Sequence, residues 1–287
     1  MASVKTVCGL IAGSVAVATI SANSSFIGKS VAPIALYAAT PAKPNVVRVT
    51  GQDFRFDAPD VIPAGLTQFR FLNKGPALHH LAILKLAGGK TIDDLRAALA
   101  NPGPPPSWVK EYGGANAAVP GEESNVTLTL TPGNYALICF VDIGGPPHFA
   151  KGMVRGLQVA PSKTADPKPA ASVTMTLFDY NFRLSGPLRA GTRTIRVHNV
   201  GKQHHEVQVV QLAPGKTVKE VLDWLGKPEG PPPGKAMGGI AGMDPGMTEY
   251  FTANFTPGKY GLICFLPDVK DGKPHLAHGM VQEITVR

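Results

Sequence analysis

Two stretches of the chain are nearly identical: residues 131–140 read Thr-Pro-Gly-Asn-Tyr-Ala-Leu-Ile-Cys-Phe, and residues 256–265 read Thr-Pro-Gly-Lys-Tyr-Gly-Leu-Ile-Cys-Phe. Each begins with a Pro-Gly turn and continues as a short apolar run that ends in Cys-Phe. Such a run, bounded by turn residues, is typical of a buried β-strand. Because the copies lie in different halves of a 287-residue chain, they indicate an internal duplication.

The duplication extends outward from these stretches on both sides. Residues 71–75 match residues 197–201, the strand-like segment 79–84 matches 205–210, and each half closes with a His followed by Gly-Met-Val. A segment rich in Pro, Lys and Ala separates the copies and has the composition of a linker. The predicted organisation is a leader over 1–43, a first domain over 44–160, a linker over 161–172 and a second domain over 173–287.

The pattern within each copy predicts an all-β fold. Short apolar runs alternate with a period of two, as in residues 126–130, and the chain has 32 Gly and 27 Pro, which suit many turns. One helix interrupts each copy, because Thr91 with Asp94, and Thr217 with Glu220, have the spacing of a capping box. We therefore expect two tandem antiparallel β-sandwiches, each with one short inserted helix.

Composition and charge exclude some classes of function. The chain is 44% hydrophobic and 17% charged, which is enough to bury a core in each half. The net charge of +8 is spread along the chain without a run of Lys and Arg, so we expect no nucleic-acid partner. An ordinary solvated surface is favoured over a basic surface that docks an acidic partner.

The N-terminus has the pattern of an export signal. Lys5 precedes an apolar run over residues 7–20 that contains no acid, and small polar residues follow at 21–25. The run is shorter than the ~20 residues of a stable membrane span. A second apolar patch at 31–39 leaves an uncleaved N-terminal membrane anchor open. We predict export to the periplasm or the extracellular space.

Two cysteines occupy the same place in the two copies, and we do not expect them to form a disulfide. Cys139 and Cys264 each lie in an apolar strand, and equivalent core positions of two domains should not come within bonding distance. In both copies an aligned His precedes the cysteine, and a second His and then a Met follow it. The predicted metal ligands are, in the first copy, His79, Cys139, His148 and Met153, and in the second, His205, Cys264, His275 and Met280. Two imidazoles, a thiolate and a weak axial thioether form the ligand set of type 1 (blue) copper, so we expect two such copper ions per chain.

Adjacent histidines leave the first ligand of each set ambiguous, and the duplication resolves it. His79 and His205 lie at the same distance from the aligned residues Asn73 and Asn199, whereas His80 aligns with Glu206. Alternation along the strand also directs the side chains of His79 and His205 inward.

The motif Asn-x-Gly-x-x-x-His, followed later by Cys…His-x4-Met, resembles that of the cupredoxins, a family that includes plastocyanin, azurin and pseudoazurin. The resemblance covers 44–160 and 173–287. It implies a Greek-key β-sandwich with copper at one end, held by the two ligand sets given above. The chain departs from small cupredoxins in the long loops between Cys and the following His, and in His80 and Glu206, where many cupredoxins have Asn.

The predicted function is electron transfer with a redox protein partner, without catalytic activity. Nitrite reductases and multicopper oxidases place a His beside the copper-ligating Cys, but here the neighbours are Ile and Phe. The spare histidines are therefore expected to lie at the surface or behind the ligands, and a Met-containing segment is expected to be a flexible loop: His80, His198, His204 and His278, and Met237, Met243 and Met247. The alternatives are an oligomeric oxidoreductase that resembles copper nitrite reductase or small laccase, and a copper storage or delivery protein.

Overall fold

The computed structural model describes residues 44–101, 105–143, 145–162 and 167–287. The regular secondary structure of these residues is almost entirely β-strand, and the predicted fold class, two tandem β-sandwich domains each with one inserted helix, is confirmed. The leader predicted over 1–43 lies outside the described residues, as do residues 163–166 of the predicted linker.

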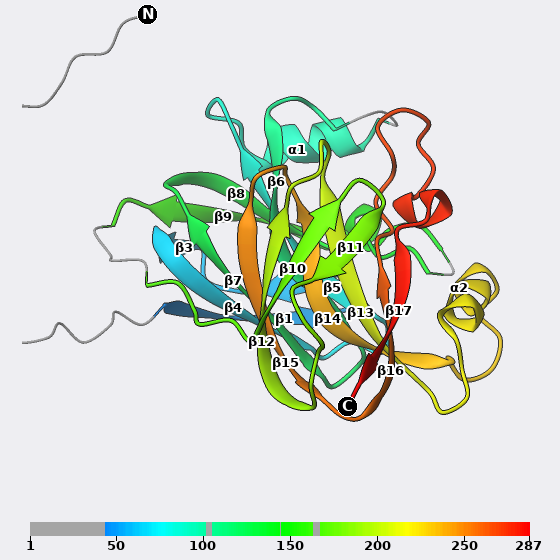
Figure 1. The fold of residues 1–287 in the computed structure, drawn as a ribbon. Helices are drawn as coiled ribbons and strands as arrows, with labels where there is room; N and C mark the ends of the chain where they lie inside the picture. Colours follow the sequence, from blue (N-terminus) through cyan, green and yellow to red (C-terminus); the bar gives the residue numbers. More distant parts are fainter. Residues whose placement is uncertain (1–43, 102–104, 144, 163–166) are drawn as a thin grey trace, which may run out of the picture. The chain divides into compact units, whose positions relative to one another are not determined.

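The two copies contain matching series of strands (Figure 1). The first copy comprises β1 (Asn45–Gln52), β2 (Arg55–Asp57), β3 (Val61–Pro63), β4 (Gly65–Asn73), β5 (His79–Leu86), β6 (Val109–Ala118), β7 (Glu123–Leu130), β8 (Gly133–Ile138) and β9 (Val154–Ala160). The second comprises β10 (Val173–Phe178), β11 (Asn181–Leu184), β12 (Gly191–Asn199), β13 (His205–Leu212), β14 (Gly234–Met243), β15 (Thr248–Phe255), β16 (Gly258–Ile263) and β17 (Val281–Val286).

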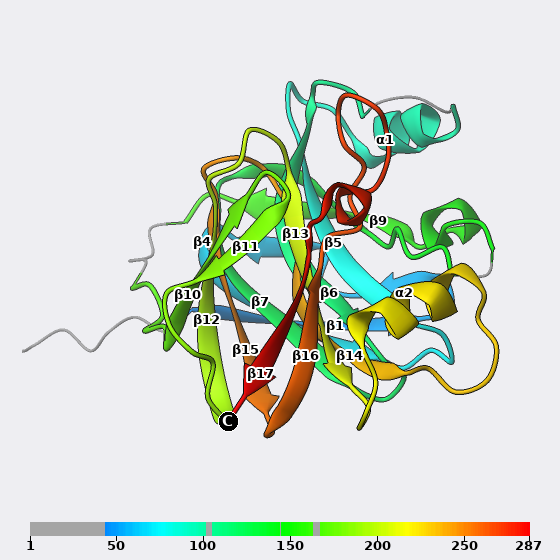
Figure 2. The same ribbon diagram turned by 45° about the vertical axis from the view of Figure 1, so that its right-hand side comes forward.

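The strands form two sheets that both continue from one copy into the other. One sheet has the order β11-β10-β12-β15-β7-β4-β1-β2 and the other β17-β16-β13-β14-β6-β5-β8-β9-β3. Figure 2 shows β17, in red, beside β16, in orange. The copies join where β7 pairs with β15 and β6 pairs with β14. The duplicated sandwiches therefore share their sheets.

The strands that lead to the two cysteines are buried on both faces. In β8, Tyr135 and Leu137 belong to the main core between the sheets, while Ala136 and Ile138 pack on the other side against Leu95 of the helix α1 (Ile92–Leu99). The continuous apolar sequence of the quoted stretches follows from this two-sided burial.

The predicted capping boxes are present in both helices. Thr91 accepts a hydrogen bond from the backbone N–H of Asp94, and Thr217 accepts one from Glu220 at the start of α2 (Val218–Gly226). The helix α2 covers β16 as α1 covers β8, through Val221 against Ile263. Among the described residues, no helix is long and apolar enough to cross a membrane.

Most of the predicted flexible Met-containing loop is instead a strand at the junction of the copies, and Met247 lies in the turn between β14 and β15. Met237 and Met243 lie in β14, where they pair with residues of β6, and Met243 is completely buried. A Gly-Gly pair lies at the equivalent irregularity of β6 and of β14. Gly114 has a φ of 130°, and a Cβ there would lie 2.0 Å from the backbone oxygen of Leu81. Glycine is required by this close approach, and its abundance made the segment look flexible.

The junction also buries a carboxyl group. Glu249 of β15 is fully buried, and one of its oxygens accepts a hydrogen bond of 3.4 Å from the backbone N–H of Gly114. The other oxygen has no hydrogen-bond partner among the described residues. Burial raises the pKa of Glu249 well above its usual value.

Replacing Glu249 with Gln is expected to stabilise the protein at neutral pH and to have little effect near pH 4. In the unfolded chain this carboxyl ionises near its ordinary pKa, while in the fold it holds its proton to a higher pH. Its burial therefore lowers the free energy of unfolding progressively as pH rises from about 4.5. Urea unfolding of both proteins from pH 4 to pH 8 should show a gain of roughly 1–3 kcal/mol for Glu249→Gln at the upper end. An equal effect at all pH values would contradict this account.

Candidate metal centres

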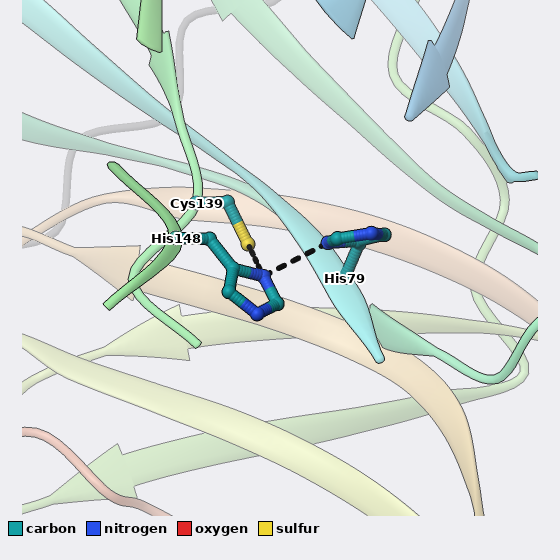
Figure 3. A group of neighbouring side chains, drawn as sticks. All are labelled: His79, Cys139 and His148. Carbon is teal, nitrogen blue, oxygen red and sulfur yellow. Dashed lines mark hydrogen bonds between the residues drawn. The ribbon is translucent and has the colours of Figure 1, made fainter. Parts of the chain in front are cut away.

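Three predicted ligands converge at one end of the first sandwich (Figure 3). His79 begins β5, Cys139 directly follows β8, and His148 begins a short 3₁₀ turn, η1 (His148–Lys151). The Nδ1 atoms of the two imidazoles lie 2.9 Å apart, and Nδ1 of His148 lies 3.5 Å from Sγ of Cys139. All three side chains are buried.

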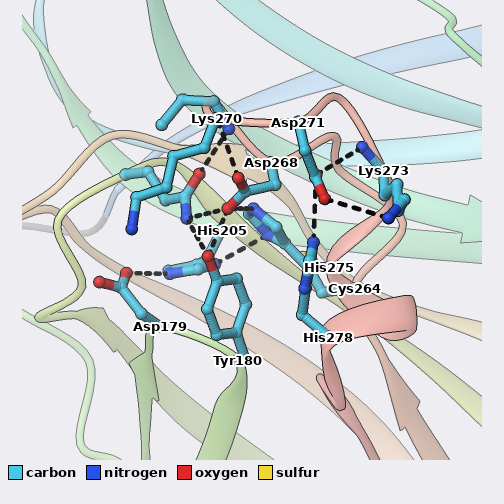
Figure 4. A network of polar contacts seen from close by, with 12 residues as sticks. Asp179, Tyr180, His205, Cys264, Asp268, Lys270, Asp271, Lys273, His275 and His278 are labelled. Atoms are coloured by element: carbon cyan, nitrogen blue, oxygen red, sulfur yellow. Dashed lines mark hydrogen bonds and ion pairs between the residues drawn. The ribbon is translucent and has the colours of Figure 1, made fainter.

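The second sandwich repeats this arrangement (Figure 4). Nδ1 of His205 lies 3.1 Å from Nδ1 of His275, which lies 3.3 Å from Sγ of Cys264. His275 begins the equivalent turn, η2 (His275–His278). Cys139 and Cys264 are both free, so they form no disulfide.

The two methionines of the predicted ligand sets are tied to the cysteines by backbone hydrogen bonds. The N–H of Cys139 donates to the carbonyl of Met153 over 3.1 Å, and the N–H of Met153 donates to the carbonyl of His148 over 3.0 Å. The same two bonds join Cys264, Met280 and His275. Met153 and Met280 are completely buried.

The Asn-x-Gly motif positions the first histidine of each centre. The side chain of Asn73 donates to the carbonyls of Ala77 and Ala118 and accepts from the N–H of Gly75. A Cβ on Gly75 would lie 2.5 Å from Nε2 of His79. The motif therefore closes the loop onto the imidazole and leaves no room for a larger residue.

An aspartate that the sequence did not predict lies behind each centre. Nε2 of His79 lies 3.1 Å from a carboxylate oxygen of Asp53, and Nε2 of His205 lies 3.0 Å from Asp179. Each aspartate precedes an aromatic residue with positive φ, 56° at Phe54 and 65° at Tyr180. The matching sequences Asp-Phe-Arg-Phe at 53–56 and Asp-Tyr-Asn-Phe at 179–182 carried this signal.

These contacts determine which ring atoms face the centre. Nε2 of His79 donates to Asp53, so its proton is there and Nδ1 directs a lone pair toward His148. Two neighbouring ring nitrogens and a sulfur, buried together, suit a cation between them. The combination of imidazole with thiolate is a donor set that copper takes. The residues thus fit the ion that the sequence predicted.

Burial determines the protonation of the ligands. It lowers the pKa of His148 and of His275 to about 4 and raises the pKa of the Cys139 thiol to about 11. The imidazoles are therefore neutral and ready to ligate at neutral pH, whereas each thiol must release its proton when a cation binds.

The residues that follow His79 and His205 hydrogen-bond to the segment that contains the cysteine. The backbone N–H of His80 points to Sγ of Cys139 over 3.5 Å, and its Nε2 accepts from the N–H of Phe140 over 2.8 Å. Glu206 accepts from the N–H of Phe265 over 2.8 Å. Burial lowers the pKa of His80 to about 4 and raises that of Glu206 to about 7.

The centres differ in how their second histidine meets the surface. His148 retains 5% exposure beside Phe140 and Phe149, whereas His275 retains none. Nε2 of His275 has no hydrogen-bond partner among the described residues and lies 4.0 Å from Asp268, in the long loop after Cys264. His275 therefore presents no edge at the surface, because that loop covers it.

A further group of potential ligands lies next to the second centre. Asp268 accepts hydrogen bonds from Tyr180 and Gln203, and Asp271 pairs with His278 (Figure 4). These side chains satisfy one another. Of the other spare histidines, His198 contacts the Met247 carbonyl and His204 is half-buried near His275.

No protein-family model matches the chain, and no curated protein matches it in sequence. Solved structures with a similar fold include auracyanin A, a "blue" copper protein from Chloroflexus aurantiacus, at 24% identity and a TM-score of 0.30, which covers 41% of this chain and 100% of its own. A blue copper oxidase from Nitrosomonas europaea matches at 14% identity and a TM-score of 0.26, over 85% of this chain and 86% of its own. A copper-containing nitrite reductase from Thermus scotoductus matches at 12% identity and a TM-score of 0.24, over 84% of this chain and 61% of its own. All three are named as copper proteins.

The prediction that the chain is not an enzyme is contradicted by this comparison. The oxidase and the nitrite reductase are enzymes, and each match spans both copies of the duplication. The prediction rested on the residues beside Cys139 and Cys264. Those neighbours alone therefore do not exclude an enzyme.

Replacing Asp53 with Ala is expected to weaken metal binding at the first centre by about tenfold or more, because His79 loses the group that orients its ring. Asp53→Asn should lose less, since its amide oxygen still accepts the hydrogen bond. The measurement is competition with a chelator, with Cu(II) as the probe. The matched control is Asp57→Ala, which removes an exposed carboxylate of β2. Equal losses for Asp53→Ala and Asp57→Ala would show that charge alone matters.

Proposed function

We propose that this chain is an exported copper protein with two type 1 copper sites that acts in electron transfer. The observation that carries the proposal is the repeated cluster of two imidazole Nδ1 atoms and one cysteine sulfur, buried at the same place in both copies. A chance cluster would not be expected twice at aligned positions.

The proposed ligands are His79, Cys139, His148 and Met153 in the first site and His205, Cys264, His275 and Met280 in the second. Bound copper would supply a one-electron Cu(II)/Cu(I) couple, with the thiolate and thioether favouring Cu(I) and the imidazoles favouring Cu(II). The chain contributes a ligand geometry that is already assembled. Asp53 and Asp179 hold one imidazole of each site, and backbone hydrogen bonds hold the Cys-His-Met loop.

Rigid ligands support electron transfer because little has to move when the oxidation state changes. Cys139 and Cys264 each follow a strand that is buried on both faces, and the backbone N–H of each donates to the carbonyl of the following methionine ligand. Such support is what precise metal sites require. Electron transfer through such sites occurs both in small carriers and in multicopper enzymes.

The proposed docking surface for a redox protein surrounds His148. Phe140 is 37% exposed and packs against Phe149, which lies next to His148 in the sequence. Exposed aromatic residues commonly anchor protein contacts. In the second copy the aligned Phe265 is equally exposed, but the loop that contains Asp268 covers His275 there. Export is proposed from the leader-like sequence over residues 1–43.

Titration with Cu(II) should give two equivalents per chain with intense visible absorption, and Cys139→Ser and Cys264→Ser should each lose about half of it. The absorption arises from thiolate-to-copper charge transfer, so it reports the ligand set as well as the stoichiometry. A colourless complex would exclude type 1 copper, and a stoichiometry above two would indicate a further site of the kind found in multicopper oxidoreductases.

Phe149→Lys is expected to slow electron self-exchange at the first site by about fivefold or more, since a charge in an apolar contact surface disfavours docking. The experiment uses the Cys264→Ser protein, so that only the first site reports, and follows NMR line broadening in mixtures of its oxidised and reduced forms. The control is Val61→Lys, which places the same charge on an exposed apolar position of β3. Unchanged self-exchange in Phe149→Lys would place the docking surface elsewhere.

A further inference from the structure

The two candidate metal centres are connected by buried side chains. In each copy, the residue after the first histidine ligand holds the backbone N–H that follows the cysteine: His80 holds Phe140 and Glu206 holds Phe265, both over 2.8 Å. The backbone N–H groups of His80 and Glu206 are also hydrogen-bonded to the cysteine sulfurs. Each of these residues therefore touches its own centre twice.

Asn116 of β6 joins these two residues. Its amide nitrogen donates to a carboxylate oxygen of Glu206 over 3.1 Å and to the carbonyl of Ile240 over 3.2 Å. Asn116 also lies opposite His80, at the irregularity between the pairs His79–Ala118 and Leu81–Ala115, and a hydrogen bond between the two side chains partly offsets the lowering of the pKa of His80. One carboxamide thus contacts both copies of the duplication.

The direction of each hydrogen bond follows from the donors that remain. Nε2 of His80 accepts from the N–H of Phe140, so the neutral ring carries its proton on Nδ1. Both amide protons of Asn116 are already donated, to Glu206 and to Ile240. The bond between His80 and Asn116 must therefore run from Nδ1–H to the amide oxygen. The donors and acceptors of all these hydrogen bonds are therefore mutually consistent.

The connection is buried, and its central amide comes from β6, whereas β14 has no equivalent amide. His80, Asn116 and Glu206 are 8%, 3% and 4% exposed. The residue of β14 equivalent to Asn116 is Ala241, as the aligned Gly-Gly pairs at 113–114 and 238–239 show. The duplication therefore yields one bridge at the junction between the copies.

We propose that His80, Asn116 and Glu206 form a bridge that couples the two metal centres, so that filling one centre changes the metal affinity of the other. The proposal rests on the proposed function. A cation beside a cysteine sulfur changes the polarisation of the N–H groups next to that sulfur, and therefore the strength of the hydrogen bonds that His80 or Glu206 makes. Asn116 contacts both residues and has no spare donor, so a change in the hydrogen bonds of one residue alters those of the other. Such coupling is reciprocal by linkage.

A thermodynamic cycle with Cu(II) as the probe tests the coupling. Chelator competition gives the overall constant for filling both centres of the parent chain, and the single-centre constants in Cys264→Ser and Cys139→Ser. The ratio of the overall constant to the product of the single constants is the coupling factor. We expect it to depart from one by about fivefold or more. In the Asn116→Ala background, which places at 116 the residue that β14 carries at the equivalent position, it should fall close to one.

The control variant is Asn125→Ala. Asn125 of β7 also spans the two copies, through hydrogen bonds with the backbone of Thr252, but it contacts no member of the bridge. Its coupling factor should equal that of the parent. If Asn116→Ala does not fold, His80→Asn replaces it, since a shorter amide can hold the N–H of Phe140 while it withdraws from Asn116.

The outcomes separate the bridge from the proposed function. Two coloured copper ions per chain with the same coupling factor in the parent, the bridge variant and Asn125→Ala would overturn the bridge and leave the copper sites intact. A loss of coupling in Asn125→Ala as large as in Asn116→Ala would overturn it too, because general loosening of the junction would then suffice. Absence of copper binding in the parent would overturn both.

Discussion

Burial of one strand on both of its faces constrains most of each copy. β8 and β16 pack against the core between the sheets on one side and against a helix on the other. A strand in this position cannot shift by one residue without moving its core side chains to the wrong face. Cys139 and Cys264, which directly follow these strands, therefore have fixed positions, and the histidine and methionine of the same loop are tied to them by backbone bonds.

The ligand side chains are organised before any metal binds. An asparagine and a glycine close the loop onto the first imidazole, an aspartate orients that imidazole, and burial keeps the rings neutral. Each of these groups is paired or packed in the described structure. A site assembled in this way has little freedom to adapt to a cation of different geometry, which suits a centre that changes oxidation state rather than one that releases its metal.

The two copies have diverged where they face different surroundings. His148 reaches the surface beside aromatic residues, whereas the longer loop after Cys264 covers His275 with Asp268. His80 and Glu206 differ in chemistry but hold equivalent N–H groups, and they meet through Asn116 at the shared sheets. The duplication therefore produced two similar centres with unequal access to solvent and a single junction between them.

The sequence by itself determined the fold class, the helices and the clusters that the structure brings together, because each depends on local patterns that the duplication displays twice. Capping boxes, the alternation of apolar residues and the repeated Cys, His and Met positions can all be recognised in the linear sequence. The sequence did not reveal Asp53 and Asp179 as partners of the histidines, the strand character of residues 234–243, the cover over His275 or the contacts of Asn116. These features depend on which distant segments meet, and that was decided when the sheets of the two copies joined and β6 paired with β14.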